Sequence, residues 1–342
     1  MQGRGIMNNH NFLSPWIKQF LLEYLINIKN LSRNTQQSYR DTFRQYLPLA
    51  AKKVHKPIDQ LIIEDLSPDG VKAYLLNIET KRKCSLATRN QRLAAIHAFA
   101  EFVGLNSPEH IDWCRQIRQI PFKKSSRSLI TYLDKNEMDA LLNAPDRSTE
   151  QGKRDYAILL FLYNTGTRAD EVAQLKIKDL DIAYNAKKDF SIVLIRGKGD
   201  KLRRCPLWHD TVNELNSLID GRGQDENVFL NRCKEPITRF GIHTLVKRYV
   251  KKLLPEFPLL DKKRVSPHTI RHTTATHLLH AGVDINTIRA WLGHVSINTT
   301  NIYVEVDLEM KAKALACCEV VSKKTKGHWR DDKDLMKFLN SL

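Results

Sequence analysis

The spacing of apolar residues changes part-way along the chain, and this change constrains the fold more than any other feature. Before residue 104 the apolar residues recur at helical intervals only, as in the stretch 86–103. After residue 130 helical patterns alternate with two short β-rich runs, 190–196 and 201–207, on either side of a glycine-containing turn. The sequence therefore predicts a helical domain followed by a mixed domain with a small antiparallel hairpin.

Four helices are predicted in the first domain. Ser14 and Ser67 each precede a proline, which is the pairing of an N-cap residue with proline in the first helical turn. A second helix is predicted to begin near Asn34, and the fourth covers 86–103. The apolar face of the fourth helix consists of Leu93, Ile96, Ala100 and Val103.

A basic segment without periodicity separates the two domains. The stretch RQIRQIPFKKSSRS is rich in Lys and Arg and contains a proline and three serines. Its composition fits a solvated linker and a segment that crosses a DNA backbone equally well. The predicted boundaries are 12–106 for the helical domain, 107–130 for the linker, 131–320 for the mixed domain, and 321–342 for a tail with a short amphipathic helix.

The charge of the chain points to a polyanionic partner. The sequence has 55 Lys and Arg against 38 Asp and Glu, a formal net charge of +17, and such a field favours nucleic acid. A basic surface kept only for solubility is the alternative, because charge alone names no partner. The candidates for DNA contact are Arg89 and Arg92 on one face of the fourth helix and Lys123 and Lys124 in the linker; all four fit phosphate contact as well as base reading.

An apolar run near the N-terminus raises the question of a membrane segment. Residues 20–28 are interrupted by Glu23 and flanked by Lys18 and Lys29. A spanning helix needs about 20 predominantly apolar residues, and a signal peptide has a different charge pattern. We therefore expect a cytoplasmic protein that makes no membrane contact.

Histidines gather in one stretch of the second domain: five of the 12 in the chain lie between residues 268 and 294. Ser266 and Pro267 predict the start of a helix, and His268 and Arg271 then share one face of its first turn. Free backbone N–H groups at a helix start favour an anion. The pattern fits a phosphate pocket, a metal site or ordinary surface histidines.

A metal site is the weaker of these explanations. His268 and His272 have the spacing of helical zinc ligands, but Thr269 stands where the H-E-x-x-H pattern has glutamate, and Arg271 would repel a cation. The six cysteines show no metal-ligand spacing. We predict no metal and no cofactor, and we expect His277 and His280 to be packing or surface residues.

Five motifs occur in a fixed order along the chain: TGTRADEV, RGKGDKLRRCPL, HTIRH, LGH and TTNIY. In this order and at this spacing they closely resemble the tyrosine recombinases, also called the phage integrase family, over most of the chain. The resemblance implies a mainly α fold with a small antiparallel sheet. The helical domain would be the core-binding domain that grips DNA, and the mixed α+β domain would be the catalytic domain.

The resemblance assigns the phosphate-binding residues. Arg168 and Arg271 would hold the scissile phosphate, and His294 would donate a hydrogen bond to one of its oxygens. Glu171 would support the arginine region. Asp170 stands where the family commonly has a serine, which adds local negative charge but removes no assigned role.

The same resemblance assigns the groups that make and break bonds. Tyr303 would be the nucleophile, His268 would accept its proton, and Lys198 would protonate the leaving 5′ oxygen. Lys201 lies in the same hairpin, but we favour Lys198 because glycines flank it in the turn.

The function implied is site-specific recombination of double-stranded DNA through a 3′-phosphotyrosyl intermediate, without metal or ATP, for integration, excision or transposition of a mobile element. The partners would be specific DNA sites and three further copies in a homotetramer, with the helix expected at 308–318 docking on a neighbour or on its own domain. The alternatives are DNA relaxation like that of type IB topoisomerases and a non-catalytic DNA-binding regulator.

Overall fold

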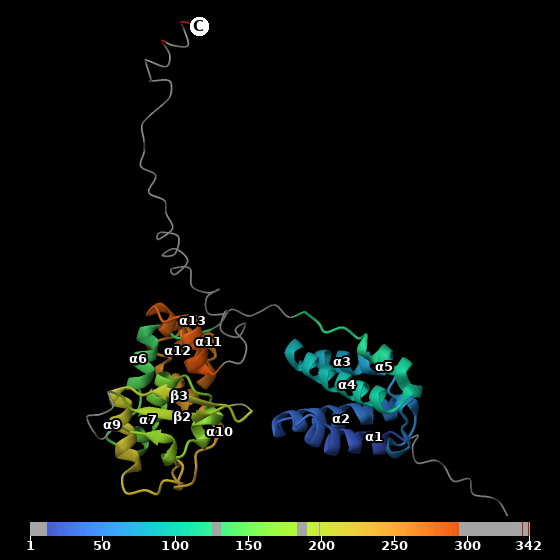
Figure 1. Cartoon of the computed structure of the whole chain (residues 1–342), viewed down its shortest axis with the longest axis horizontal. Helices are drawn as coiled ribbons and strands as arrows, with labels where there is room; N and C mark the ends of the chain where they lie inside the picture. The colour runs from blue at the N-terminus through green and yellow to red at the C-terminus, as the bar shows by residue number, and fades with distance from the viewer. Residues whose placement is uncertain are drawn as a thin grey trace, which may run out of the picture. The chain divides into compact units, whose positions relative to one another are not determined.

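The structure is a computed structural model that describes residues 12–124, 131–182, 190–197 and 199–293, with the single positions 337 and 341. The chain divides into two compact units, residues 1–128 and 129–342, each with a core of its own (Figure 1). The model is mainly helical with one small sheet, as the sequence predicts. No helix in the described part of the chain combines the length and apolar character needed to cross a bilayer.

The first unit is a bundle of helices around an aromatic core. Phe20, Phe43 and Phe99 are fully buried, and the rings of Phe43 and Phe99 lie 5.2 Å apart, edge to face. Its main helices are α1 (Leu13–Gln19), the π-helix η2 (Phe20–Ile28), α2 (Arg33–Val54), α3 (Pro68–Thr80), α4 (Leu86–Asn106) and α5 (Ile111–Arg118), joined by the 3-10 turns η3 (Ile58–Gln60), η4 (Ile63–Asp65) and η5 (Pro108–His110).

The helix starts agree with the sequence at α3 but not at α1. Ser67 caps α3 by accepting a hydrogen bond from the N–H of Gly70 at 3.1 Å. Helix α1, however, begins at Leu13, so the prediction of Ser14 as its N-cap is wrong. The cause is tertiary: the Leu13 N–H donates to the carbonyl of Leu61 at 2.7 Å, and Phe12 forms a bridge with Ile62. These contacts fix the backbone at Phe12 and Leu13, so the helix begins before the predicted cap at Ser14.

Helix α5 extends the first domain beyond its predicted end. Trp113 and Ile117 lie in the core, and the Trp113 indole N–H donates to the carbonyl of Leu66 at 3.0 Å. Ile120 is buried there as well. The predicted linker start at residue 107 is therefore wrong, because residues up to 120 belong to the bundle. The buried face of α5 is short, consisting of Trp113, Cys114 and Ile117, and the charged Arg115 and Arg118 beside it conceal the helical period.

The second unit packs helices around a three-stranded antiparallel sheet of order β1-β2-β3. Figure 1 shows α7 passing behind β2 and β3, and α7 is buried along nearly its whole length. The elements are α6 (Lys135–Asn143), α7 (Glu150–Thr165), α8 (Ala169–Gln174), η6 (Ile177–Asp179), β1 (Leu180–Asp181), β2 (Ile192–Arg196), β3 (Leu202–Pro206), α9 (His209–Ile219), α10 (Arg239–Leu253), α11 (Leu259–Lys263), α12 (Pro267–His280) and α13 (Ile285–Leu292).

This list confirms the predicted hairpin and the helix predicted to begin at Pro267. The capping box of Asp134 and Glu137 is present at the start of α6. The helix expected at 308–318 and the tail helix lie outside the described residues.

A buried carboxylate ties α7 to α10. Asp155 has no exposed surface, and its two oxygens accept hydrogen bonds from Arg154 at 2.6 Å, from the Tyr249 hydroxyl at 2.9 Å, and from Arg248. A buried charge is tolerated when such donors surround it. The helix that leads to Arg168 is thereby anchored at its middle.

Polar side chains also fix α12 against its neighbours. The Thr274 hydroxyl donates to the Tyr163 carbonyl at 2.8 Å, which joins α12 to α7. The Leu133 N–H donates to Thr273 Oγ1 at 2.9 Å, and His277 Nε2 donates to the Leu133 carbonyl at 3.1 Å. The first residues of the second unit are thus bonded to α12 at two points.

His277 Nδ1 lies 2.7 Å from the Tyr163 hydroxyl, and His280 is exposed at the helix end. This confirms that the two histidines serve packing and surface.

Candidate active site

Arg168 lies where α7 ends and α8 begins. Gly166 ends α7 with a φ of 59°, a left-handed conformation that glycine adopts at little cost. Arg168 then occupies the N-cap position of α8, where its backbone N–H donates to Glu171 Oε2 at 3.0 Å and its Nη1 donates to Glu171 Oε1 at 2.7 Å. The Arg168 side chain is 38% exposed. One edge of the guanidinium is therefore held while the group still reaches solvent.

Glu171 joins Arg168 to the hairpin. Its carboxylate is nearly enclosed and also accepts a hydrogen bond from Arg203 Nη2 at 2.7 Å. Burial acts to raise the pKa of this carboxyl, but the hydrogen bond and charge of Arg203, together with the bonds from Arg168, outweigh it and leave the pKa below its ordinary value. Glu171 is thus an ionised bridge between two arginines.

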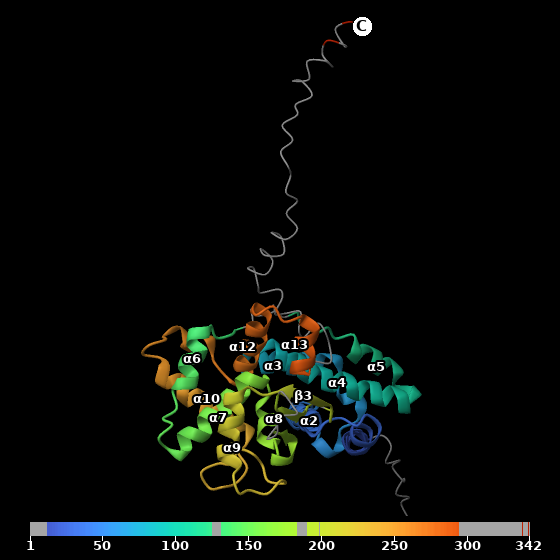
Figure 2. The ribbon, with the colours of Figure 1, turned by 60° about the vertical axis from the view of Figure 1, so that its left-hand side comes forward.

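Arg271 connects the ends of two other helices. It is 1% exposed; its Nη1 donates to the carbonyl of Gly166 and its Nη2 to the carbonyl of Leu292, both at 2.6 Å. Figure 2 shows α12 and α13 side by side, and their packing agrees with this link. A guanidinium carries five N–H donors in a rigid fork, which suits it to bridging several acceptors.

His268 stands in the first turn of α12 with an exposed side chain. The predicted cap is present, since Ser266 Oγ accepts from the Thr269 N–H. Partial desolvation of the ring by the surrounding protein lowers the pKa of His268, and the positive charges of Arg271 and Arg168 lower it further. His268 is therefore neutral at neutral pH and able to accept a proton.

His272 lies one turn further along α12, with its ring 4.4 Å from that of His268. Burial, followed by the nearby His268 and Arg271, lowers the pKa of His272 to about 4. His272 is therefore also uncharged at neutral pH.

The structure thus brings Arg168, His268 and Arg271 together where α7 ends and α12 begins. The other three candidates, Lys198, His294 and Tyr303, lie outside the described residues.

Two glycines next to the undescribed candidates are nevertheless placed. A Cβ added to Gly197 would lie 3.4 Å from both Glu171 Oε1 and Arg203 Nη1. A Cβ added to Gly293, which has a φ of +66°, would lie 3.1 Å from Arg203 Cδ. The backbone just before Lys198 and the backbone just before His294 therefore both pass beside Arg203.

Arg203 is a site residue that sequence reasoning missed. It pairs with Ile195 across the hairpin, so its side chain shares the inner face of the sheet with that buried residue. The only signal available from sequence is this alternation, because its partners Glu171 and Trp291 are far away along the chain.

The four candidates for DNA contact in the first unit differ in their surroundings. Arg89 is buried, with Nη1 donating to the carbonyl of Pro121 at 2.9 Å. Arg92 donates to the carbonyl of Ser38 at 2.8 Å, and Lys123 donates to Glu79 at 2.6 Å.

Lys124 is exposed, like Lys123. The enclosed Arg89 anchors the chain leaving α5 and presents little surface for a phosphate contact, unlike the other three candidates.

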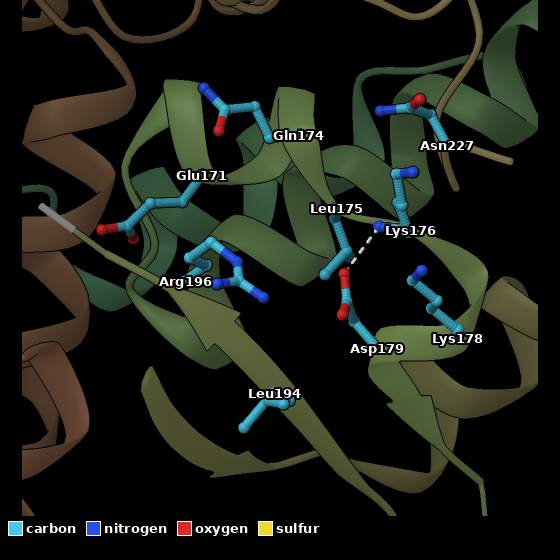
Figure 3. Close-up of a pocket in the computed structure, with 9 residues that line it drawn as sticks. All are labelled: Glu171, Gln174, Leu175, Lys176, Lys178, Asp179, Leu194, Arg196 and Asn227. Carbon is cyan, nitrogen blue, oxygen red and sulfur yellow. Dashed lines mark hydrogen bonds between the residues drawn. The ribbon is translucent and has the colours of Figure 1, made fainter. Parts of the chain in front are cut away.

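An open pocket of about 430 Å³ lies on the outer face of β2. Figure 3 shows that the Glu171 side chain extends away from Lys176 and Lys178, so its carboxylate lies on the side of the pocket opposite these two lysines. Lys178 pairs with Asp225 at 2.6 Å and Arg196 with Asp200 at 2.7 Å. The pocket adjoins the site at Arg168, because Glu171 belongs to both. Its lining is Glu171, Gln174, Leu175, Lys176, Lys178, Asp179, Leu194, Arg196 and Asn227.

Within residues 12–124, 131–182, 190–197 and 199–293, no three His, Cys, Asp or Glu side chains gather closely enough to hold an ion. Four cysteines in these ranges, Cys84, Cys114, Cys205 and Cys233, are free thiols.

Family models match both units of the chain. The model described as the phage integrase family matches residues 131–310, and the model described as the phage integrase N-terminal SAM-like domain matches residues 17–104. The chain belongs to the phage integrase family of tyrosine recombinases. The two matches fall on the mixed unit and on the helical unit, so the predicted family and the predicted pairing of a core-binding with a catalytic domain are confirmed.

Individual relatives extend over nearly the whole of this recombinase. It is 37% identical over 338 residues to a protein of Sinorhizobium fredii named as integrase/recombinase y4rC, an alignment that covers 98% of this chain and 100% of the relative. It is 30% identical over 306 residues to the tyrosine recombinase XerC of Pelobacter propionicus, covering 87% and 92% of the two chains. The enzyme is therefore a site-specific DNA recombinase, as the motifs predict.

Solved structures share its fold. The integrase of transposon Tn1549, in complex with a circular intermediate DNA, matches with a TM-score of 0.66 at 18% identity and covers 88% of this chain and 99% of that one. The recombinase XerH bound to its difH substrate matches with a TM-score of 0.62 at 21% identity, covering 85% and 81%. Both matches support the tyrosine-recombinase fold of the chain.

Proposed function

We propose that the recombinase cuts and rejoins duplex DNA through Tyr303. Its phenolate oxygen attacks the scissile phosphorus, the bond from phosphorus to the 5′ oxygen breaks, and a 3′-phosphotyrosyl link remains. A 5′ hydroxyl from a second strand then attacks the same phosphorus and releases Tyr303. The bond energy stays in the covalent link, so the cycle needs neither ATP nor a metal ion.

The observation that carries this proposal is the meeting of Arg168, His268 and Arg271 at one place in the second unit. Phosphoryl transfer requires positive groups around the non-bridging oxygens, and guanidinium groups bind these oxygens in a bidentate manner. We assign this task to Arg168 and Arg271. Because Arg271 is enclosed in this conformation, its contact with phosphate requires the guanidinium to become accessible when DNA binds.

The proton of Tyr303 needs an acceptor, because a free phenol has a pKa of about 10. His268 is exposed, and its pKa is lowered, so it is neutral and basic where the positive charge of the two arginines also stabilises a phenolate. On the other side of the phosphorus the leaving oxygen needs a proton. We assign that role to Lys198 in the hairpin turn and a hydrogen bond to a phosphate oxygen to His294.

We also propose that the recombinase acts as a homotetramer on specific DNA sites and serves a mobile element. The name of y4rC, an integrase/recombinase, supports integration as the biological setting. In the first unit, Arg92, Lys123 and Lys124 are proposed to meet phosphates, which position a protein on DNA without reading its sequence.

The test is a covalent trap. Wild-type protein and Tyr303→Phe are each incubated, with and without EDTA, with nicked duplexes tiled from the DNA that flanks the gene, and the products are separated on denaturing gels. We expect a protein–DNA band for the wild type alone. A band from Tyr303→Phe would remove Tyr303 as nucleophile, and loss of the wild-type band in EDTA would remove the metal-free mechanism. Catalytic relaxation of plasmids that lack any site would favour a topoisomerase.

A further inference from the structure

Three segments of the second unit converge on one guanidinium, that of Arg203. Its Nη2 donates to Glu171, the residue that holds Arg168, at 2.7 Å. Its Nε donates to the carbonyl of Trp291, in the last turn of α13, at 3.0 Å. Its side chain also lies against Gly197 and Gly293, the residues directly before Lys198 and His294.

The position of Arg203 in the sheet explains how one side chain contacts all three segments. The side chain projects from the inner face of β3 and is 9% exposed, whereas its neighbour Arg204 projects outward and is exposed. A buried guanidinium is costly unless acceptors surround it. Glu171 supplies the countercharge and the end of α13 supplies a carbonyl, so the rigid fork of Arg203 fixes both at once.

We propose that Arg203 is a positioning residue for the strand-cleavage reaction. It holds the Arg168–Glu171 pair, Gly197 directly before Lys198, and the end of α13 at Gly293 directly before His294 in one fixed arrangement. The inference rests on the proposed function, because it assigns Arg203 no contact with DNA and gives it effect only through residues that act on the scissile phosphate.

A purely structural arginine would behave differently. Its loss would lower the stability of the unit and would impair DNA binding and cleavage in proportion. A positioning residue affects the cleavage step at saturating protein and leaves the affinity for DNA close to that of the wild type, because misplacement of reacting groups by about 1 Å slows a reaction by about 100-fold.

The variants for the test are Arg203→Lys and Arg203→Gln, with Arg204→Lys and Arg204→Gln as matched controls on the same strand. Lysine keeps a positive charge opposite Glu171 but cannot bond Glu171 and the Trp291 carbonyl together. Thermal unfolding is measured first; Arg203→Lys carries the test if Arg203→Gln does not fold. The readouts are the Kd for a nicked recombination site and the single-turnover rate of covalent complex formation.

We expect Arg203→Lys to lower the cleavage rate by about 100-fold with little change in Kd, and the Arg204 variants to cleave like the wild type. Wild-type cleavage by Arg203→Lys would overturn the inference. So would a loss of DNA affinity that accounts for the whole loss of rate. If wild-type protein itself forms no covalent complex, the proposed function fails instead, so the two failures are distinguishable.

A second substrate tests which of the three segments Arg203 acts through. When sulfur replaces the 5′ bridging oxygen, attack by Tyr303 breaks a phosphorus–sulfur bond and a thiolate leaves without needing a proton. Lys198→Ala is expected to regain its rate on this substrate. Arg203→Lys is expected to remain slow, because Arg168 and His294 are still displaced. Full recovery of Arg203→Lys would show that it acts through the Lys198 loop alone and would overturn the wider role.

Discussion

Arg271 Nη2 lies 2.6 Å from the carbonyl oxygen of Leu292, so an arginine assigned to the scissile phosphate also closes the last turn of α13. The same guanidinium bonds the carbonyl of Gly166, at the end of α7. The proposed phosphate contact and local stability are therefore joined in one side chain, and we expect substitutions at Arg271 to affect both.

Arg271→Lys is expected to abolish detectable cleavage and to lower the free energy of unfolding by about 2 kcal/mol, because one ammonium cannot satisfy both buried carbonyls. Urea unfolding and the covalent trap measure the two effects. Arg232→Lys, in an exposed loop, is the control and should match the wild type in both. Unchanged stability of Arg271→Lys would contradict the bridging role of the guanidinium.

The rate of cleavage is expected to fall at low pH as His268 takes up a proton. Protonated His268 cannot accept the proton of Tyr303, and because its pKa is lowered, the fall should have its midpoint below the ordinary histidine value of about 6.5. Single-turnover rates of covalent complex formation, measured between about pH 4 and pH 8, give the pH dependence of cleavage.

His268→Gln is expected to be slow throughout and to lack this acidic limb, while the exposed His280→Gln should keep it. A limb that persists unchanged in His268→Gln would assign the proton to another group.

Asp155→Ala is expected to lower the free energy of unfolding of the second unit by about 3 kcal/mol, because it leaves Arg154 without its buried countercharge and breaks the link to Tyr249. Asp170→Ala removes an exposed carboxylate close to the site and is expected to cost less than about 0.5 kcal/mol. Chemical denaturation of the two variants makes the comparison. Equal costs would show that the buried cluster contributes no net stability.

A fragment of residues 12–124 is expected to fold alone, whereas a fragment of residues 12–106 should not fold cooperatively. The shorter piece loses the burial of Trp113, Ile117 and Ile120, and each large apolar side chain contributes about 1.5–3 kcal/mol. Circular dichroism during heating distinguishes the two. A cooperative transition of the shorter fragment at the same midpoint would restore the domain boundary at residue 106.

Local signals predicted much of this fold. The caps at Ser67 and Ser266 are properties of four or five consecutive residues, and the structure has both. The hairpin follows from alternation within two short runs. The start of α1 could not be predicted in this way, because a contact with Leu61 decides it.

The residues of the candidate site also differ in whether local sequence or tertiary contacts reveal them. Motif order identifies Arg168, His268 and Arg271 as members of one site, and the structure places them together. Arg203 carries no motif of its own and resembles any charged residue of a hairpin. Its importance depends on the twist and packing that bring Glu171 and Trp291 to it, which no local pattern encodes.

The two hydrogen bonds of Leu133 bear on how chimeric recombinases should be assembled. Leu133 is bonded to Thr273 and His277 on the helix that carries His268 and Arg271, so this irregular segment is part of the second unit's scaffold even though it follows the linker directly. A foreign DNA-recognition module should therefore be fused upstream of this residue. A junction placed after Leu133 would sever the catalytic helix from its own leading segment and would compromise turnover whatever site the new module reads.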